Sequence, residues 1–141
     1  MRPLLLLSFL VLIGACYEEE PRTYSDYELI AGQDAFGKSW KITGIEVTGL
    51  GSLDPFPCIA DNNIVFYTDG RYENSEGYVK CDPNDPPAFE GNWYFNSRSD
   101  SMTISLEDSV RSWSVDYLSD YKMRLTSEFA NDSRTYVFSV R

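Results

Sequence analysis

Apolar and polar residues alternate along most of the chain from Trp40 onward. In the segment SMTISLE, Met102, Ile104 and Leu106 share one face, and polar residues occupy the other. A period of two predicts a β-strand with one buried face. The same period occurs in WKITGIEV, NIVFYT, RYENSEGYV, GNWYFN and the runs 113–117, 123–125 and 136–140. Short turn sequences separate these runs, so the pattern predicts about eight consecutive antiparallel strands.

Two local signals refine this strand pattern. The dipeptide Asp69-Gly70 lies between NIVFYT and RYENSEGYV, and it suits the positive φ angles of a tight type I′ hairpin. In WKITGIEV, the apolar phase passes from Ile42 to Ile45, which predicts a bulge or a sharp bend at Gly44. In residues 113–117 the period places Trp113, Val115 and Tyr117 on one face.

The number and order of the strands predict the fold. Eight antiparallel strands in sequence order can close into an up-and-down barrel, which removes exposed sheet edges. A two-sheet sandwich fits the strand count nearly as well. The immunoglobulin pattern, however, requires a tryptophan between its two cysteines, and none lies between Cys58 and Cys81 here. The segment SDYELIAG predicts a helix capped by Ser25 or Asp26 and ended by Gly32. We therefore predict an all-β, eight-stranded antiparallel up-and-down β-barrel with a short N-terminal helix.

The predicted inward-facing residues are unusually large. An eight-stranded barrel is just wide enough either to fill itself with side chains or to hold one small ligand. Bulky aromatic residues suit both interiors, although at strand spacing they more often pack a core than line a pocket. If the barrel holds a ligand, the candidate binding residues are Trp40, Phe66, Trp93, Phe95, Trp113, Met123 and Tyr136.

The chain opens with one basic residue and an apolar stretch from Leu4 to Ala15. This stretch is shorter than the roughly 20 residues that span a bilayer as a helix, and its anatomy predicts a secretory signal peptide. Cys16 follows directly, and the sequence LIGAC resembles the lipobox of bacterial lipoproteins. The resemblance implies that Cys16 carries the lipid and that the mature protein is anchored in a membrane without spanning it. An ordinary signal peptide with a cysteine at the cut site is the alternative.

Three glutamates, Glu18 to Glu20, follow the cysteine and open a polar segment without an apolar period. Such a segment predicts a solvated tether. Acidic residues behind a lipidated cysteine also resemble the export signal of surface lipoproteins of Bacteroidota, which implies an outer membrane lipoprotein exposed at the cell surface. The predicted organisation is a signal peptide over 1–15, the lipidated cysteine, tether and short helix over 16–35, and the barrel over 36–141.

Composition narrows the classes of partner. The formal net charge is −10 at pH 7, whereas a nucleic-acid binder needs a basic face, so nucleic acid is excluded as a partner. A strongly acidic protein can attract a basic protein partner, so this class of partner stays open. Apart from Cys16, the remaining cysteines are Cys58 and Cys81, and in an exported protein this pair predicts a disulfide. Closing that loop stabilises the fold by about 3 kcal/mol in the loop-entropy description.

The residue types argue against catalysis. The chain has no histidine, which excludes Ser-His-Asp and Cys-His arrangements and makes two cysteines a poor zinc site. Paired glycosidase carboxylates remain conceivable, with Glu73, Glu76 or Glu90 as candidates, but carboxylates of an acidic chain usually lie on a solvated face. The segment CDPNDPP lacks the glycine and bidentate glutamate of a calcium loop and predicts a proline-rich turn. We expect no enzyme activity, no metal and no cofactor.

Several short motifs follow one another in the order found in lipocalin-like domain proteins of Bacteroidota. They are Trp40 at the start of the first strand, CIADN at 58–62, FYTDG at 66–70, Cys81, and EGNW at 90–93. The chain resembles this family over about residues 36–141. The resemblance implies a calycin-type eight-stranded barrel, usually carried by a lipoprotein.

The chain also departs from the pattern of true lipocalins. They carry Gly-x-Trp at the first strand, whereas two residues separate Gly37 from Trp40 here. Their late Thr-Asp-Tyr turn has a counterpart in the sequence SDY at 119–121. In lipocalins an arginine near the last strand packs on that tryptophan, and the resemblance implies this role for Arg141. These departures weaken the case for ligand transport more than the case for the barrel.

Two functions from different classes follow. The first is a lipid-anchored binding module that holds a small apolar or sugar ligand at the cell envelope, and the resemblance favours it. Tyrosines near the barrel mouth would then stack on sugar rings, with Tyr67, Tyr72, Tyr78 and Tyr94 as candidates, although tyrosine also favours plain cross-strand packing. The second is a filled barrel whose acidic surface meets a basic protein, such as a lysozyme or a protease that it inhibits.

Overall fold

The computed structural model describes residues 24–96, 100–128 and 132–141. The predicted signal peptide, Cys16 and the glutamates behind it lie outside the described residues. The helices of the described chain are α1 (Asp26–Ala31) and α2 (Pro57–Ala60). Its strands are β1 (Lys38–Val47), β2 (Gly51–Leu53), β3 (Asn63–Phe66), β4 (Arg71–Ser75), β5 (Ala88–Phe95), β6 (Ser101–Leu106), β7 (Ser109–Leu118), β8 (Lys122–Glu128) and β9 (Ser133–Val140).

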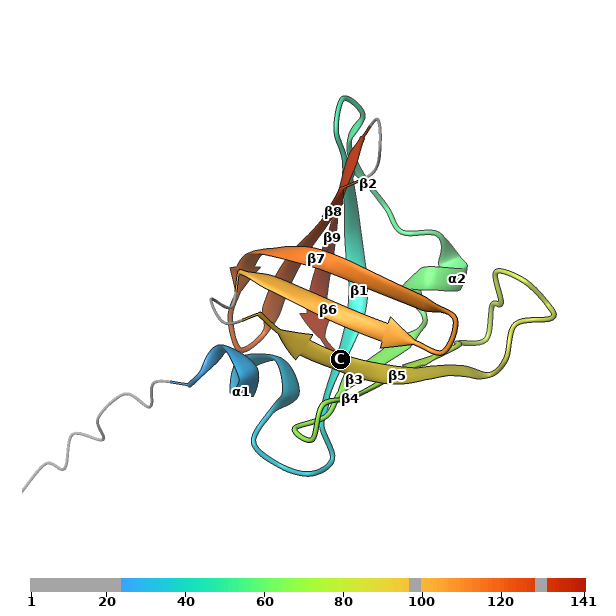
Figure 1. The fold of residues 1–141 in the computed structure, drawn as a ribbon. Helices are drawn as coiled ribbons and strands as arrows, with labels where there is room; N and C mark the ends of the chain where they lie inside the picture. Colours follow the sequence, from blue (N-terminus) through green and yellow to red (C-terminus); the bar gives the residue numbers. More distant parts are fainter. Residues whose placement is uncertain (1–23, 97–99, 129–131) are drawn as a thin grey trace, which may run out of the picture.

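The strands close into a barrel. Strands β1 and β3 to β9 follow one another as antiparallel neighbours, and β1 pairs with β9 to complete the ring (Figure 1). Strand β2 is a three-residue addition that folds back on the end of β1, with Val47 opposite Gly51. The predicted eight-stranded antiparallel up-and-down barrel is therefore confirmed, and β2 is a small extension of it.

Two bulges bend the strands of the barrel. The pairing of β1 with β9 shifts between Ile42 and Gly44, which confirms the predicted irregularity. A second shift, between Val115 and Tyr117 in β7, was not predicted from the sequence. The extra residue moves Tyr117 off the face of Val115, so Tyr117 is exposed and Leu118 pairs with Met123. The expected grouping of Tyr117 with Trp113 and Val115 was therefore wrong.

Strands β3 and β4 form the predicted hairpin, but the turn that joins them is not of the predicted type I′. The N–H of Gly70 donates to the carbonyl of Tyr67 at 3.0 Å, so Thr68 and Asp69 take the central positions. Gly70 follows them with a φ of 87°, as in a type I turn closed by a left-handed glycine rather than a type I′ turn. The Asp69 carboxylate favours this geometry, because its Oδ1 accepts a hydrogen bond from the N–H of Arg71.

Helix α1 closes one end of the barrel. Ser25 and Glu28 form the predicted capping box, and Gly32 ends the helix with a φ of 78°. Ile30 and Ala31 are fully buried, and the Trp40 Nε1–H donates to the Ile30 carbonyl at 2.8 Å. The interior beneath the helix is packed with large side chains that are at most 2% exposed: Trp40, Phe66, Trp93, Met102 and Met123.

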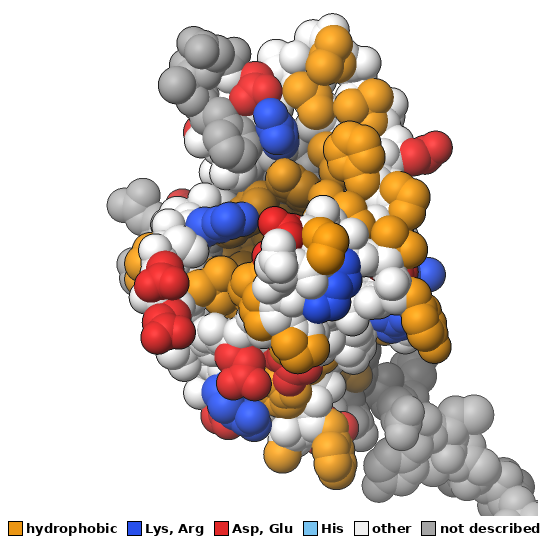
Figure 2. All heavy atoms as spheres, turned by 90° about the vertical axis from the view of Figure 1, so that its right-hand side faces the viewer, with side chains coloured by type: hydrophobic (Ala, Val, Ile, Leu, Met, Phe, Trp, Pro, Cys, Tyr) orange, Lys and Arg blue, Asp and Glu red, His pale blue; other side chains and the backbone are white. Residues whose placement is uncertain are grey.

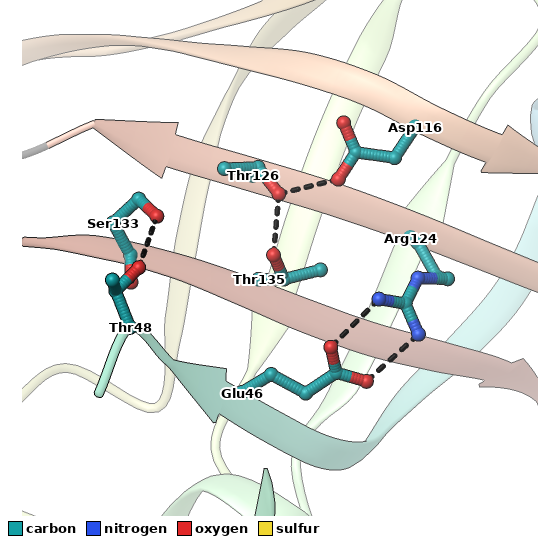
Figure 3. Close-up of polar contacts among 7 residues, drawn as sticks. All are labelled: Glu46, Thr48, Asp116, Arg124, Thr126, Ser133 and Thr135. Atoms are coloured by element: carbon teal, nitrogen blue, oxygen red, sulfur yellow. Dashed lines mark hydrogen bonds and ion pairs between the residues drawn. The ribbon is translucent and has the colours of Figure 1, made fainter. Parts of the chain in front are cut away.

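Polar side chains cross the outer face of the seam between β1 and β9. Arg124 on β8 reaches over β9 and donates to both Glu46 carboxylate oxygens at 2.7 Å (Figure 3). Beside this pair, the Thr126 hydroxyl bridges Asp116 on β7 and Thr135 on β9. These contacts join strands β1, β7, β8 and β9 on the outside of the barrel.

Candidate functional site

A cavity of about 230 Å³ opens at the end of the barrel away from α1. Figure 2 looks onto this end and shows a hollow with hydrophobic side chains in its depth, and with both Lys or Arg and Asp or Glu side chains at its edge. Nine of the lining side chains are aliphatic or aromatic: Ile42, Ile59, Ile64, Phe66, Ile104, Trp113, Leu125, Tyr136 and Phe138. Four others are polar or amphipathic: Asn62, Tyr72, Asn74 and Arg111.

Strand register explains why polar residues face this cavity. Directly opposed residues of an antiparallel pair project to the same side of the sheet. Asn74 lies opposite Ile64, and Arg111 lies opposite Ile104. Because Ile64 and Ile104 are buried in the interior, Asn74 and Arg111 belong to the inner face of the barrel. Asn62 comes from the short segment that joins α2 to β3.

Two buried polar atoms of the cavity wall have no hydrogen-bond partner within the described chain. They are the Oδ1 of Asn74 and the Nε1 of Trp113. An unpaired buried polar group costs about 1–3 kcal/mol, so native structures seldom leave one unsatisfied. One hydrogen-bond donor and one acceptor in the cavity wall are therefore unpaired within the described chain.

Tyr72 and Arg111 form the remaining polar wall. Burial raises the pKa of Tyr72 to about 12, and the positive charge of Arg111 opposes this shift. The phenol is therefore neutral at physiological pH and can donate or accept a hydrogen bond. The Arg111 side chain is exposed, and within the described residues no carboxylate forms a salt bridge with it.

A second, shallower groove of about 620 Å³ lies beside the cavity on the outer surface. It is lined by Ser39, Asp61, Asn63, Ser75, Glu76, Gly77, Tyr78 and Arg141. Three buried acceptor oxygens here lack a partner within the described chain: Asp61 Oδ1, Asn63 Oδ1 and Glu76 Oε2. Gly77 is required at its position, because a Cβ atom there would lie 2.1 Å from the Asp61 carboxylate carbon.

The predicted disulfide ties together the segments that border both sites. Cys58 in α2 is bonded to Cys81 in the β4–β5 connection, with the Cα atoms 5.1 Å apart, which confirms the predicted pairing. Next to it, the Asp61 Oδ2 accepts a hydrogen bond from the Val79 N–H, and the Asn62 Oδ1 accepts one from the Gly77 N–H, each at 3.0 Å. Helix α2 and the long connection therefore form one braced side of the cavity mouth.

The predicted ligand-binding residues divide between the two ends of the barrel. Phe66, Trp113 and Tyr136 line the cavity. The others pack at the α1 end, where Trp40, Trp93 and Met123 are at most 2% exposed and Phe95 contacts Trp93 edge to face. Sequence reasoning did not select Asn74 or Arg111, because it took only apolar residues at inward positions. Their strand phase contained the signal: Asn74 is two residues from Tyr72, and Arg111 is two from Trp113.

Other residues singled out from the sequence lie elsewhere. Tyr78 is fully exposed beside the groove, Tyr94 is exposed on the outer face, and Tyr67 is half-buried with Arg71 over its ring. Arg141 donates to the backbone carbonyls of Asp61 and Asn62 at 3.3 Å, whereas the cation over the Trp40 ring is Lys38.

Over 24–96, 100–128 and 132–141, no three His, Cys, Asp or Glu side chains gather in a way that could hold a metal ion. In the same ranges, no helix has the length and apolar character that crossing a bilayer requires.

Comparison with solved structures finds a likeness in fold. The chain is similar to a lipocalin-like protein from Bacteroides uniformis ATCC 8492, with a TM-score of 0.54 and 14% sequence identity. The likeness covers 72% of this chain and 94% of the other chain. No family model and no curated protein sequence matches the chain. The fold is a lipocalin-like, closed, eight-stranded antiparallel barrel.

Proposed function

We propose that the barrel binds one small, predominantly apolar molecule in the cavity at its open end. The observation that carries the proposal is the cavity itself: about 230 Å³, open to solvent and walled mainly by aliphatic and aromatic side chains. Sites for small molecules are typically concave, mostly apolar and supplied with a few placed polar groups. Pockets for drug-sized ligands span roughly 300–1,000 Å³, so the molecule proposed here is smaller.

A ligand-binding site explains the cavity better than a packing defect does. Protein interiors are close-packed, and voids larger than a water molecule are few. The α1 end of this barrel meets that standard, with Trp40, Met102 and Met123 fully buried. The open end instead combines unfilled volume with the unpaired Trp113 Nε1 and Asn74 Oδ1. Volume and unsatisfied polar groups in one place are what a ligand site requires.

The test is native mass spectrometry of the full chain after exposure to a lipid and metabolite extract of its own organism. We expect a reproducible added mass. Ile104→Phe places a larger side chain in the cavity wall and should abolish the added mass. Val110→Phe adds the same ring to the same hairpin at an exposed position, so it is the matched control and should retain the added mass.

A bare protein mass under all conditions would contradict the proposal. An added mass that survives Ile104→Phe would also contradict it, because the ligand would then lie outside the cavity. Either result would direct attention to a basic protein partner of this acidic chain, sought by pull-down at low salt.

A sugar ligand in the outer groove is a second candidate function. It is favoured by the three unpaired acceptor oxygens of Asp61, Asn63 and Glu76, which sugar hydroxyls could satisfy, and by the exposed ring of Tyr78 beside them. A glycan array probed with the full chain tests it. Binding that is lost in Tyr78→Ala and kept in Tyr94→Ala would support the groove, and an array without any bound glycan would count against it.

Membrane anchoring through Cys16 completes the proposal and rests on the sequence alone. The lipobox-like LIGAC and the acidic residues behind it support a lipoprotein of the outer membrane that faces the cell surface. In cells, the wild-type protein should incorporate labelled palmitate and be removed by protease shaving. Cys16→Ala should incorporate no label, and a labelled Cys16→Ala protein would refute the assignment of the lipid to this residue.

A further inference from the structure

Arg111 is a cation on the inner face of the barrel. It lies near the start of β7, two residues before Trp113 and opposite the buried Ile104 of β6. Its side chain lines the cavity although the residue is exposed. An arginine in this situation covers apolar surface with its stem and keeps the guanidinium at the water boundary. The guanidinium therefore stands at the mouth of the cavity.

Arg111 differs from the other arginines of the described chain in its partners. Three of them form salt bridges, Arg71 with Asp69, Arg124 with Glu46 and Arg134 with Asp132, and Arg141 donates to two carbonyls. Within the described residues, the Arg111 side chain has no salt bridge and no hydrogen bond. The chain contains 22 acidic residues against 12 basic ones, so carboxylates are abundant, yet none lines this cavity.

Neutral hydrogen-bond donors accompany this cation. The Trp113 Nε1–H is buried without a partner in the described chain, and the Tyr72 hydroxyl stays protonated because its pKa is raised to about 12. The acceptors of the wall are neutral amides, Asn62 and Asn74. The wall therefore carries one positive charge, several neutral polar groups and no negative charge, which favours an anion near the mouth.

We infer that the ligand is a small amphipathic anion whose apolar body fills the cavity and whose oxyanion head, such as a carboxylate, binds Arg111 at the mouth. Arginine presents a planar fork of donors that matches a carboxylate in two-point contact. The volume of about 230 Å³ limits the body to a short chain or a single ring. This inference rests on the proposed function, since it assigns the chemical class of the molecule that the cavity holds.

The experiment compares sodium octanoate with 1-octanol, which have the same carbon chain and differ in the charge of the head. Calorimetric titration of the full chain measures both affinities. We expect octanoate to bind about tenfold more tightly or better, because a hydrogen bond to a charged group contributes more than a neutral one. The preference should shrink as ionic strength rises.

Variants of Arg111 assign the preference to this residue. Arg111→Gln should reduce octanoate affinity by about tenfold more than it reduces 1-octanol affinity, so that the preference for octanoate disappears. Arg111→Lys should keep part of the preference, because the charge remains without the planar fork. Lys41→Gln is the matched control: it removes one positive charge from an exposed position on β1 and should leave both affinities unchanged. A merely structural role of Arg111 would weaken both ligands equally.

The possible results separate the two proposals. Equal affinities for octanoate and 1-octanol, or a preference that survives Arg111→Gln, would overturn the anion inference while the cavity remains a ligand site. A preference for octylammonium over octanoate would overturn it as well. Absence of binding by all three molecules would overturn the anion inference together with the proposed function.

Discussion

Tyr72 is the residue whose ionisation responds most to its position in the barrel. It is 9% exposed, and burial raises the pKa of its phenol to about 12 from an ordinary value of 10.0. The folded state therefore holds this proton more tightly than the unfolded state. The stabilisation is fully present below pH 10 and is lost as the pH rises toward 12.

This linkage predicts a difference in alkaline stability between the wild type and Tyr72→Phe. The wild type should lose up to about 3 kcal/mol of unfolding free energy through this group as the pH rises from 10 to 12. Phenylalanine at position 72 has no phenol proton to lose, so the stability of the variant should fall less between pH 10 and pH 12. Urea unfolding at several pH values measures both slopes, and parallel slopes would refute the shifted pKa.

At the scale of elements, a fully buried hydrogen bond is one of the contacts that join α1 to the barrel. The Trp40 Nε1–H donates to the Ile30 carbonyl, at a place where both residues are fully buried. We expect Trp40→Phe to lower the unfolding free energy by about 1–3 kcal/mol, because the carbonyl loses its partner. Trp113→Phe is the control, since Trp113 Nε1 has no bond to lose within the described chain. Urea unfolding should show a clearly smaller loss for the control, and equal losses would contradict this account.

The second prediction at this scale concerns the disulfide between α2 and the β4–β5 connection. Replacing both Cys58 and Cys81 with serine should lower the unfolding free energy by about 3 kcal/mol, because the unfolded chain regains its freedom. Chemical unfolding with and without a reductant measures the effect. Reductant should destabilise the wild type by a similar amount and leave the double variant unchanged. A wild type that is indifferent to reductant would contradict the prediction.

At the scale of the whole molecule, ligand binding and folding are linked. A molecule that binds only the folded barrel stabilises it, by about 2.7 kcal/mol at one hundred times its dissociation constant. Octanoate should therefore raise the melting temperature of the wild type in a concentration-dependent way, and it should not do so for Ile104→Phe. Val110→Phe should respond like the wild type. Thermal unfolding monitored by circular dichroism tests this, and equal shifts in all three proteins would place the effect outside the cavity.

Local patterns in the sequence determined the elements of the fold. Alternation predicted the strands that form the barrel, because side chains of a strand alternate between the inside and the outside. The capping signals of Ser25 and Gly32 predicted α1, and the phase slip near Gly44 predicted the bulge in β1. The pairing of Cys58 with Cys81 followed from the cysteine count and the predicted signal peptide. Each of these depends on neighbours in the chain or on covalent chemistry.

Only the tertiary structure decided which inward residues pack and which line the cavity. Alternation places Trp40 and Trp113 on the inner face alike, but it carries no information on their height along the barrel axis. Helix α1 closes the end that holds Trp40, whereas Trp113 lies at the open end. The role of Arg111 also depends on its pairing with the buried Ile104 across the β6–β7 hairpin. Strand register and the position of α1 are set by long-range packing, so the sequence determined the barrel and the tertiary structure decided the site.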